Sequence, residues 1–269
     1  MTRLNQEFEK NGFVVCEMTT QAKSLMKECR DLVHHYFPAE PEYYAALGRS
    51  EFHKISYECQ LAINSINFQK RFLLLEQNNI EQLIDYKTLF HESVIFLRSV
   101  RPNALNVQGN KSKSAEYLGI HRETMYSDNP EQISRAINLW IPLENCTQDS
   151  TLCFIPNSHK IPDQELNWIA RYNDPRNVEK GSIGHKLGNL YLNKEITSGF
   201  SPDTLRRFAH NKDQYILFSP LLLHGGSLNT TLSIRQSLSM ALINESNISF
   251  NKKYTAANGM PHYTSFNIK

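Results

Sequence analysis

The chain has 269 residues, of which 40% are hydrophobic, and its 29 Lys and Arg against 27 Asp and Glu leave a formal net charge of +2. This length and composition exclude a mini-protein and a disordered chain, and the small net charge argues against nucleic acid as a partner. No apolar run approaches the roughly 18 residues of a membrane span and the polar N-terminus does not resemble a signal peptide, so we expect a cytoplasmic protein with no membrane partner.

The first ninety residues predict a layer of helices. Between residues 22 and 36, apolar side chains recur at i, i+3, i+4 and i+7, and Thr19 or Thr20 can cap the N-terminus of this helix. The step Phe37–Pro38 ends it, because proline disfavours helical geometry in the residue before it. Shorter helical patterns follow at about 50–63, 68–75 and 80–89.

After residue 91 the pattern changes to short β-type runs separated by polar turns. We expect strands at 93–100, 135–143, 151–156, 214–219 and 235–244. A long polar segment, about 161–212, interrupts them, with one helix expected near 163–170. Long loops in compact domains are often functional, so this segment is a candidate lid that sets substrate choice; a solvated insertion is the alternative.

The five cysteines predict buried free thiols. Their number is odd, and no pair has C-x-x-C spacing, which argues against both a disulfide framework and a zinc knuckle. They are Cys16, Cys29, Cys59, Cys146 and Cys153.

A possible metal site begins with the pair His121 and Glu123. On an extended chain, side chains two residues apart point to the same face, so one metal ion can bind both. His224, a hundred residues later, can complete one triangular face of an octahedron, which leaves the opposite face for a cosubstrate and dioxygen. Two His and one carboxylate form the facial triad of non-haem iron oxygenases, although any single His here could equally be a hydrogen-bonded structural residue.

Arg235 strengthens this interpretation. In the strand that begins there, alternation places Arg235, Ser237 and Ser239 on one face and apolar residues on the other. A buried guanidinium needs a partner, and the distal carboxylate of a dicarboxylate ligand offers charge-assisted hydrogen bonds, with the Ser237 hydroxyl as a further donor.

Four segments resemble the phytanoyl-CoA dioxygenase (PhyH-like) family of Fe(II)/2-oxoglutarate oxygenases. The run from Phe218 through His224 to Arg235 resembles the second metal motif of the family. The other three segments resemble its N-terminal opening and its central signature, and they are 8–15, 136–143 and 153–160. The similarity extends from about residue 5 to residue 244, but 161–212 resembles nothing in the family.

The resemblance implies that His121, Glu123 and His224 bind Fe(II) and that Arg235 anchors 2-oxoglutarate. Trp140 matches a position beside the cosubstrate, and Asn138 shares its strand face. Two positions depart from the family: Glu123 stands where Asp is usual, and Gly226 lacks a common hydroxyl, which leaves Ser227 or Ser237 to substitute.

The implied fold is mainly β with flanking helices: a double-stranded β-helix, a cupin-like jelly roll, buttressed by N-terminal helices. We expect a single domain over 1–269, with helical support at 1–90, a β-helix core at 91–244 and a C-terminal extension at 245–269. Arg122 lies between two ligands and points away from them on a regular strand, which favours a surface ion pair over a substrate contact.

The implied reaction is oxidation of a polar small metabolite, with a sugar, an amino acid or a natural-product intermediate as the candidate classes. Hydroxylation, desaturation, epimerisation and cyclisation all remain open, whereas halogenation is disfavoured because Glu123 occupies the position a halide would need. A catalytically silent or ligand-sensing jelly roll is the alternative of a different class. The sequence does not indicate an oligomeric state.

Overall fold

The N-terminal part of the chain forms most of the helices. The computed structural model describes residues 2–102, 119–126, 130–148, 150–170, 194–208, 211–227, 229, 231–244 and 263–266. The chain begins with α1 (Arg3–Asn11) and β1 (Phe13–Glu17). The following helices are α2 (Thr20–Tyr36), α3 (Pro41–Ala46), α4 (Arg49–Ser65), α5 (Phe68–Leu75) and α6 (Gln77–Ile80).

Three of the four helices predicted in the first ninety residues are present. The Thr19 hydroxyl caps α2 by accepting a hydrogen bond from the Ala22 amide at 3.2 Å. The prediction of a helix over 80–89 is wrong. The Asp85 carboxylate accepts from the Lys87 amide, and this turn leads through the 3-10 helix η1 (Tyr86–Thr88) into β2 (Leu89–Glu92).

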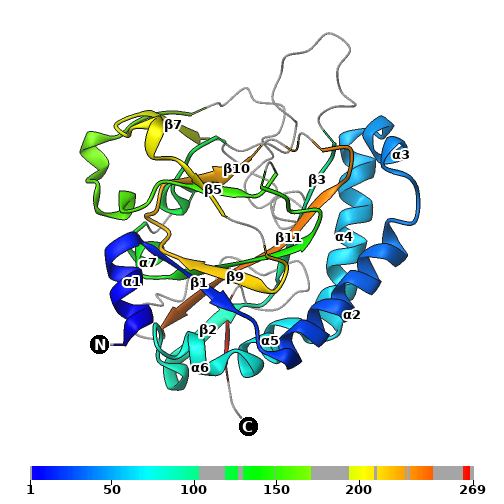
Figure 1. Cartoon of the computed structure of the whole chain (residues 1–269), viewed down its shortest axis with the longest axis horizontal. Helices are drawn as coiled ribbons and strands as arrows, with labels where there is room; N and C mark the ends of the chain where they lie inside the picture. Colours follow the sequence, from blue (N-terminus) through cyan, green and yellow to red (C-terminus); the bar gives the residue numbers. More distant parts are fainter. Residues whose placement is uncertain are drawn as a thin grey trace.

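Two antiparallel sheets face each other (Figure 1). Within the described residues the larger sheet has seven strands in the order β1-β9-β4-β11-β2-β12, with β3 also paired to β11, and the smaller sheet has the order β10-β5-β8. The further strands of the larger sheet are β3 (Phe96–Val100), β4 (Ile137–Glu144), β9 (Gln214–Phe218), β11 (Arg235–Asn244) and β12 (Tyr263–Ser265). The smaller sheet contains β5 (Leu152–Phe154), β8 (Arg206–Arg207) and β10 (His224–Gly226).

The two faces of the larger sheet pack against different parts of the protein. One face packs against α2, α4 and α5 in the main hydrophobic core, where Leu139, Leu217 and Leu238 meet Leu25 and Phe72. In Figure 1 these helices run along one side and beneath the strands. The fold is therefore a double-stranded β-helix buttressed by N-terminal helices, as the sequence predicts.

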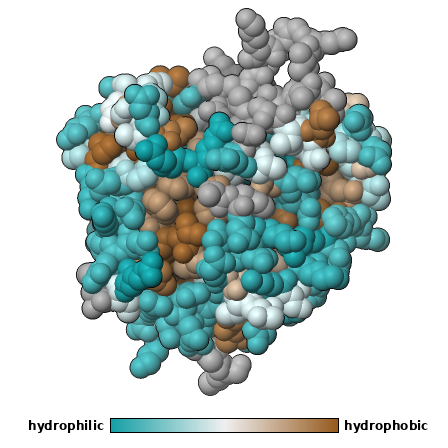
Figure 2. All heavy atoms as spheres, in the orientation of Figure 1, coloured by the Kyte–Doolittle hydropathy of each residue, from teal (hydrophilic) through white to brown (hydrophobic). Residues whose placement is uncertain are grey.

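The opposite face, called the inner face below, looks toward the smaller sheet. On it Trp140, Ile216 and Phe218 pack with Leu152 and Phe154 of β5. Phe13 of β1 also contacts Phe154, with ring centroids 4.3 Å apart. Figure 2 shows apolar atoms in a hollow on the side of the molecule where β1 and β5 lie in Figure 1.

Outside the two main sheets, β6 (Asn167–Ala170) pairs with β7 (Lys194–Ser198). This pairing corrects the helix predicted near 163–170. Only Asp163–Glu165 forms a 3-10 turn, η5, and the residues after it extend because their hydrogen-bonding partners lie in β7. Part of the C-terminal extension, β12, adds a strand beside β2.

Two composition-based expectations can also be compared with the structure. All five cysteines are free and buried, as predicted. Among the described helices, none is both long and apolar enough to cross a membrane.

Candidate metal centre

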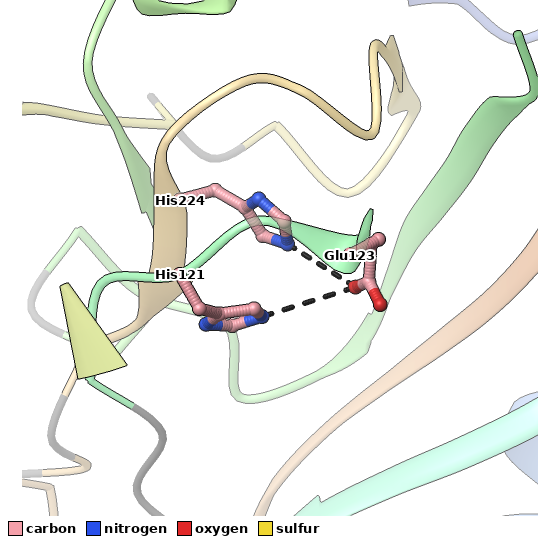
Figure 3. A group of neighbouring side chains, drawn as sticks. All are labelled: His121, Glu123 and His224. Atoms are coloured by element: carbon pink, nitrogen blue, oxygen red, sulfur yellow. Dashed lines mark hydrogen bonds and ion pairs between the residues drawn. The ribbon is translucent and has the colours of Figure 1, made fainter. Parts of the chain in front are cut away.

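His121 and His224 come from two segments that pair directly. The His121 amide donates to the His224 carbonyl at 2.9 Å, and the His224 amide donates back to the His121 carbonyl at 3.1 Å. The two imidazole rings consequently lie side by side, with centroids 4.4 Å apart (Figure 3). β10 carries His224, whereas His121 makes only this isolated bridge.

Glu123 completes the group, but from a turn and not from a strand. It begins the 3-10 helix η3 (Glu123–Tyr126), and its amide donates to the Pro220 carbonyl at 3.0 Å. The expectation that His121 and Glu123 lie on one extended strand is therefore wrong. The carboxylate still points toward both rings (Figure 3), with Oε1 3.3 Å from His224 Nε2 and 3.8 Å from His121 Nε2.

The backbone fixes which ring nitrogen faces the centre. His121 Nδ1 lies 2.7 Å from the Gly119 carbonyl, and His224 Nδ1 lies 2.8 Å from the Leu222 carbonyl. A carbonyl only accepts, so each Nδ1 carries a proton, and each ring turns its Nε2 toward Glu123. One ligand atom from each residue lies within 4.8 Å of the others, and two imidazole nitrogens with a carboxylate oxygen suit Fe(II).

Electrostatics keep these groups in the forms that bind a cation. Burial lowers the pKa of His224, and the neighbouring His121 adds to this effect, which favours the neutral ring. Burial alone would raise the pKa of the Glu123 carboxyl, but the neighbouring His121 and His224 rings hold that pKa well below the ordinary value. Glu123 keeps 39% of its side chain exposed while both rings are buried, so the centre is open on the carboxylate side.

The predicted cosubstrate anchor lies on the inner face of β11. Arg235 is buried, and its Nη1 donates to Ser237 Oγ at 3.1 Å. Gly226, two residues after His224, lies beside the guanidinium, because a Cβ added there would be 3.4 Å from Arg235 Nη2. The absent side chain at Gly226 therefore leaves space beside the Arg235 guanidinium.

The structure brings Asn138 and Trp140 to the same inner face. Both lie on β4, where Asn138 is opposite Ala241 and Trp140 is opposite Ser239. Trp140 packs edge-on against Phe208. Asn138 Nδ2 is buried and has no hydrogen-bond partner, so its donor capacity is available to a ligand. Of the two serines that could replace the missing hydroxyl, Ser227 has a buried Oγ with no hydrogen-bond partner among the described residues, whereas Ser237 Oγ accepts from Arg235.

Sequence reasoning missed Arg98. It lies on β3 opposite Ser237, and its Nε is 3.4 Å from Ser239 Oγ. Its side chain is exposed, but desolvation by the surrounding protein lowers the pKa of the guanidinium. The negative charges of Glu123 and Glu92 oppose this shift. A guanidinium remains charged despite such a shift. The alternation Phe96, Arg98, Val100 in an apolar strand was the signal that could have revealed it.

Two other predictions concern the surroundings of the centre. Arg122 is not a surface residue: its side chain is 2% exposed and pairs with Asp163. In the candidate lid, Asn167 is exposed on β6 and donates to Ser198 Oγ at 2.9 Å. The sequence of the candidate lid offers further polar donors to a ligand and glycines that would permit hinge motion, all within 171–193 and outside the described residues; they are Arg171, Asn173, Arg176, Asn177, His185, Gly181, Gly184 and Gly188.

Together, the fold and the site define a double-stranded β-helix protein with a His-Glu-His candidate metal centre. The family described as Phytanoyl-CoA dioxygenase (PhyH) matches residues 8–237, most of the chain. The chain belongs to this family, and it is an oxygenase-type enzyme. Among curated proteins, no match was found.

Several solved structures are similar to this chain. The epimerase SnoN, in complex with Fe3+, alpha ketoglutarate and nogalamycin RO, is 13% identical with a TM-score of 0.49, over 90% of this chain and 82% of SnoN. EvdO2 from Micromonospora carbonacea var. aurantiaca, complexed with 2-oxoglutarate, is 13% identical with a TM-score of 0.48, over 91% of each chain. The non-heme monooxygenase ThoJ is 16% identical with a TM-score of 0.47, over 90% of this chain and 77% of ThoJ.

Proposed function

We propose that this protein is a non-haem Fe(II)- and 2-oxoglutarate-dependent dioxygenase that oxidises a polar small molecule. The observation that carries this proposal is the convergence of His121 Nε2, His224 Nε2 and the Glu123 carboxylate within one group. Membership in the phytanoyl-CoA dioxygenase family supports the same class of reaction.

In this function His121, Glu123 and His224 would hold the iron. Bound iron supplies dioxygen activation, coupled to conversion of 2-oxoglutarate into succinate and carbon dioxide. The chain supplies the preorganised ligands, because the Gly119 and Leu222 carbonyls orient the two rings before any metal binds.

The inner face has two cations suited to a dicarboxylate. Arg235, held by Ser237, takes the distal carboxylate of 2-oxoglutarate in this proposal. Arg98 lies on the other side of Ser237 and within electrostatic reach of Glu123, so it can balance the second carboxylate. Trp140 lies opposite Ser239 on the same inner face and packs edge-on against Phe208.

A polar substrate fits the rest of the inner face. Asn138 offers an unpaired donor, and Ser239 and Glu92 lie on the neighbouring part of β11 and β2. Hydroxylation of a sugar, an amino acid or a natural-product intermediate is the outcome we favour, and epimerisation, desaturation or cyclisation would use the same groups. We further propose a cytoplasmic protein with no nucleic-acid or membrane partner.

The test is succinate formation from 2-oxoglutarate with Fe(II), in a screen of polar metabolites, followed by the mass shift of the product. His121→Ala, Glu123→Ala and His224→Ala should each abolish turnover, because two remaining ligands leave an incomplete site. The metal-free variants should stay folded, since the ligands lie outside the main core. His35→Ala, in an exposed part of α2, is the matched control.

Full activity in any two of the ligand variants would contradict the metal assignment. A wild-type protein that binds metal but forms no succinate with any metabolite would favour the ligand-sensing alternative.

A further inference from the structure

Arg122 is a buried guanidinium between two proposed metal ligands. Among the described residues, its hydrogen-bond and ion-pair acceptors belong to one short stretch of chain, residues 158–163. Nη2 donates to the carbonyls of Ser158 and Ile161, both at 2.7 Å, and Nη1 pairs with the Asp163 carboxylate. A buried cation is costly without such partners, so Arg122 and this stretch fix each other in place. The planar fork of the guanidinium is what allows one side chain to serve three acceptors.

Ser158 extends this connection to the other ligand-bearing segment. Its hydroxyl donates to the Ile155 carbonyl at 2.6 Å and accepts from the Leu223 amide at 2.8 Å. Leu223 immediately precedes His224, and its carbonyl accepts from the Ile155 amide at 2.9 Å. The hydrogen bonds therefore run from Arg122 through Ser158 to the residue beside His224.

Glu123 is the ligand that most needs such support. The two histidine segments already hold each other through their paired backbones, whereas Glu123 begins a turn, where its amide donates to the Pro220 carbonyl. Its side chain is also the most exposed of the three. Because Arg122 is the adjacent residue, its buried anchors set the direction in which the chain enters that turn.

We propose that Arg122, acting through Ser158, is a positioning residue that sets the distance between the Glu123 carboxylate and His224. This inference rests on the proposed function, because it concerns the same three ligands. Arg122 itself contacts none of the reacting groups in this proposal. It makes the spacing of the metal ligands depend on the stretch 158–163, at the beginning of the candidate lid.

The test measures metal-site geometry without turnover. Wild type, Arg122→Lys and Arg122→Gln are titrated with Co(II), and the dissociation constant, the visible spectrum of bound Co(II) and the thermal unfolding of the metal-free protein are recorded. We expect the Co(II) dissociation constant to rise about 10–100-fold in both variants, with a changed spectrum. Lys should retain the Asp163 pair but lose carbonyl contacts, so it should not restore the wild-type spectrum.

Arg71→Gln is the matched control, because Arg71 forms a two-point ion pair with Glu28 on the surface, outside the 158–163 network. It should alter neither the Co(II) dissociation constant nor the spectrum. Arg122 variants that unfold at lower temperature but keep the wild-type dissociation constant and spectrum would overturn the proposal, since Arg122 would then be merely structural.

A milder variant keeps the test decisive if the Arg122 variants do not fold. Asp163 is 72% exposed, so Asp163→Asn should fold while weakening one of the three anchors. It should raise the Co(II) dissociation constant in the same direction by a smaller factor, and an unchanged constant and spectrum would again contradict the proposal. Failure of the proposed function is distinguishable, because wild type itself would then bind Co(II) no better than His224→Ala.

Discussion

The guanidinium of Arg235 is buried on the inner face, where Ser237 is one hydrogen-bond partner and Gly226 leaves space beside it. Cys146 lies close enough for the positive charge to counteract part of the rise that burial causes in the thiol pKa, which reaches about 11. A buried guanidinium of this kind is suited to bind an anionic ligand.

Arg235→Leu should raise the 2-oxoglutarate concentration needed for half-maximal turnover by more than tenfold. The loss of a buried charge-assisted pair costs on the order of 2–5 kcal/mol. Co(II) binding should change little, because Arg235 is not a proposed ligand. The measurement is 2-oxoglutarate saturation of succinate formation, alongside Co(II) titration.

Arg235→Lys should recover part of the affinity, since an ammonium keeps the charge but lacks the planar fork. Identical 2-oxoglutarate saturation in wild type and the Leu variant would rule out this role for Arg235.

At the scale of elements, α1 and β1 meet at Gly12, which also contacts the turn after β5. Gly12 has a φ of 83°, and an added Cβ would lie 2.5 Å from His159 Nδ1 and 2.9 Å from Leu222 Cδ1. The Gly12 carbonyl accepts from the Ser219 amide, and the preceding Asn11 carbonyl accepts from the Asn157 amide, both at 2.8 Å. This junction joins the N-terminal opening to residues 157–159 and to 219–222, the segment that leads to His224.

Gly12→Ala should lower the free energy of unfolding by about 1–3 kcal/mol, because an L side chain is strained at this φ and crowds its neighbours. Denaturant unfolding of the metal-free protein measures the effect. Gly48→Ala is the control, since Gly48 has a negative φ and its added Cβ would meet only the flexible Glu51 side chain. Equal stability of wild type and Gly12→Ala would show that the junction tolerates a side chain.

The elements that sequence predicted well are those whose signal is local. The helix α2 has both a cap at Thr19 and a periodic apolar face, and β4 and β11 are long apolar strands. The strands β1, β2 and β6 were missed because they are short and their partners are distant; β1, for example, pairs with β9 at residues 214–218. Pairing energy of this kind is absent from a local window.

In the candidate site, too, local features could be predicted and contacts between distant segments could not. The residue types at His121, Glu123 and His224 were readable from the pattern, but the turn that begins at Glu123 was not. The burial of Arg122 depends on Asp163 and the carbonyls around it, which are contacts across the fold. Arg98 escaped notice because its neighbours on β11 are brought to it only by strand pairing.

For the whole molecule, the helices cover one face of the larger sheet, so a ligand must approach the centre between the two sheets (Figure 1). The paired strands β6 and β7 are held next to the segment that carries His121. The Ile196 amide of β7 donates to the Ile120 carbonyl at 2.7 Å, one residue before His121. Asp163, a few residues before β6, pairs with Arg122. Described residues on both sides of 171–193 are therefore held to the segment that carries His121 and Glu123.

This arrangement gives the lid prediction a sharp test, because Ala170 and Lys194 are directly paired in the β6–β7 ladder. A two-residue Asn-Gly turn can replace 171–193 without moving these ends, since such turns close antiparallel hairpins. If the segment sets substrate choice, the shortened protein should bind Co(II) as wild type does but lose most substrate-stimulated 2-oxoglutarate turnover. In wild type, hydrogen exchange over 171–193 should slow when a stimulating metabolite is added to the metal and 2-oxoglutarate complex. Unchanged exchange together with unchanged turnover in the shortened protein would instead identify a solvated insertion.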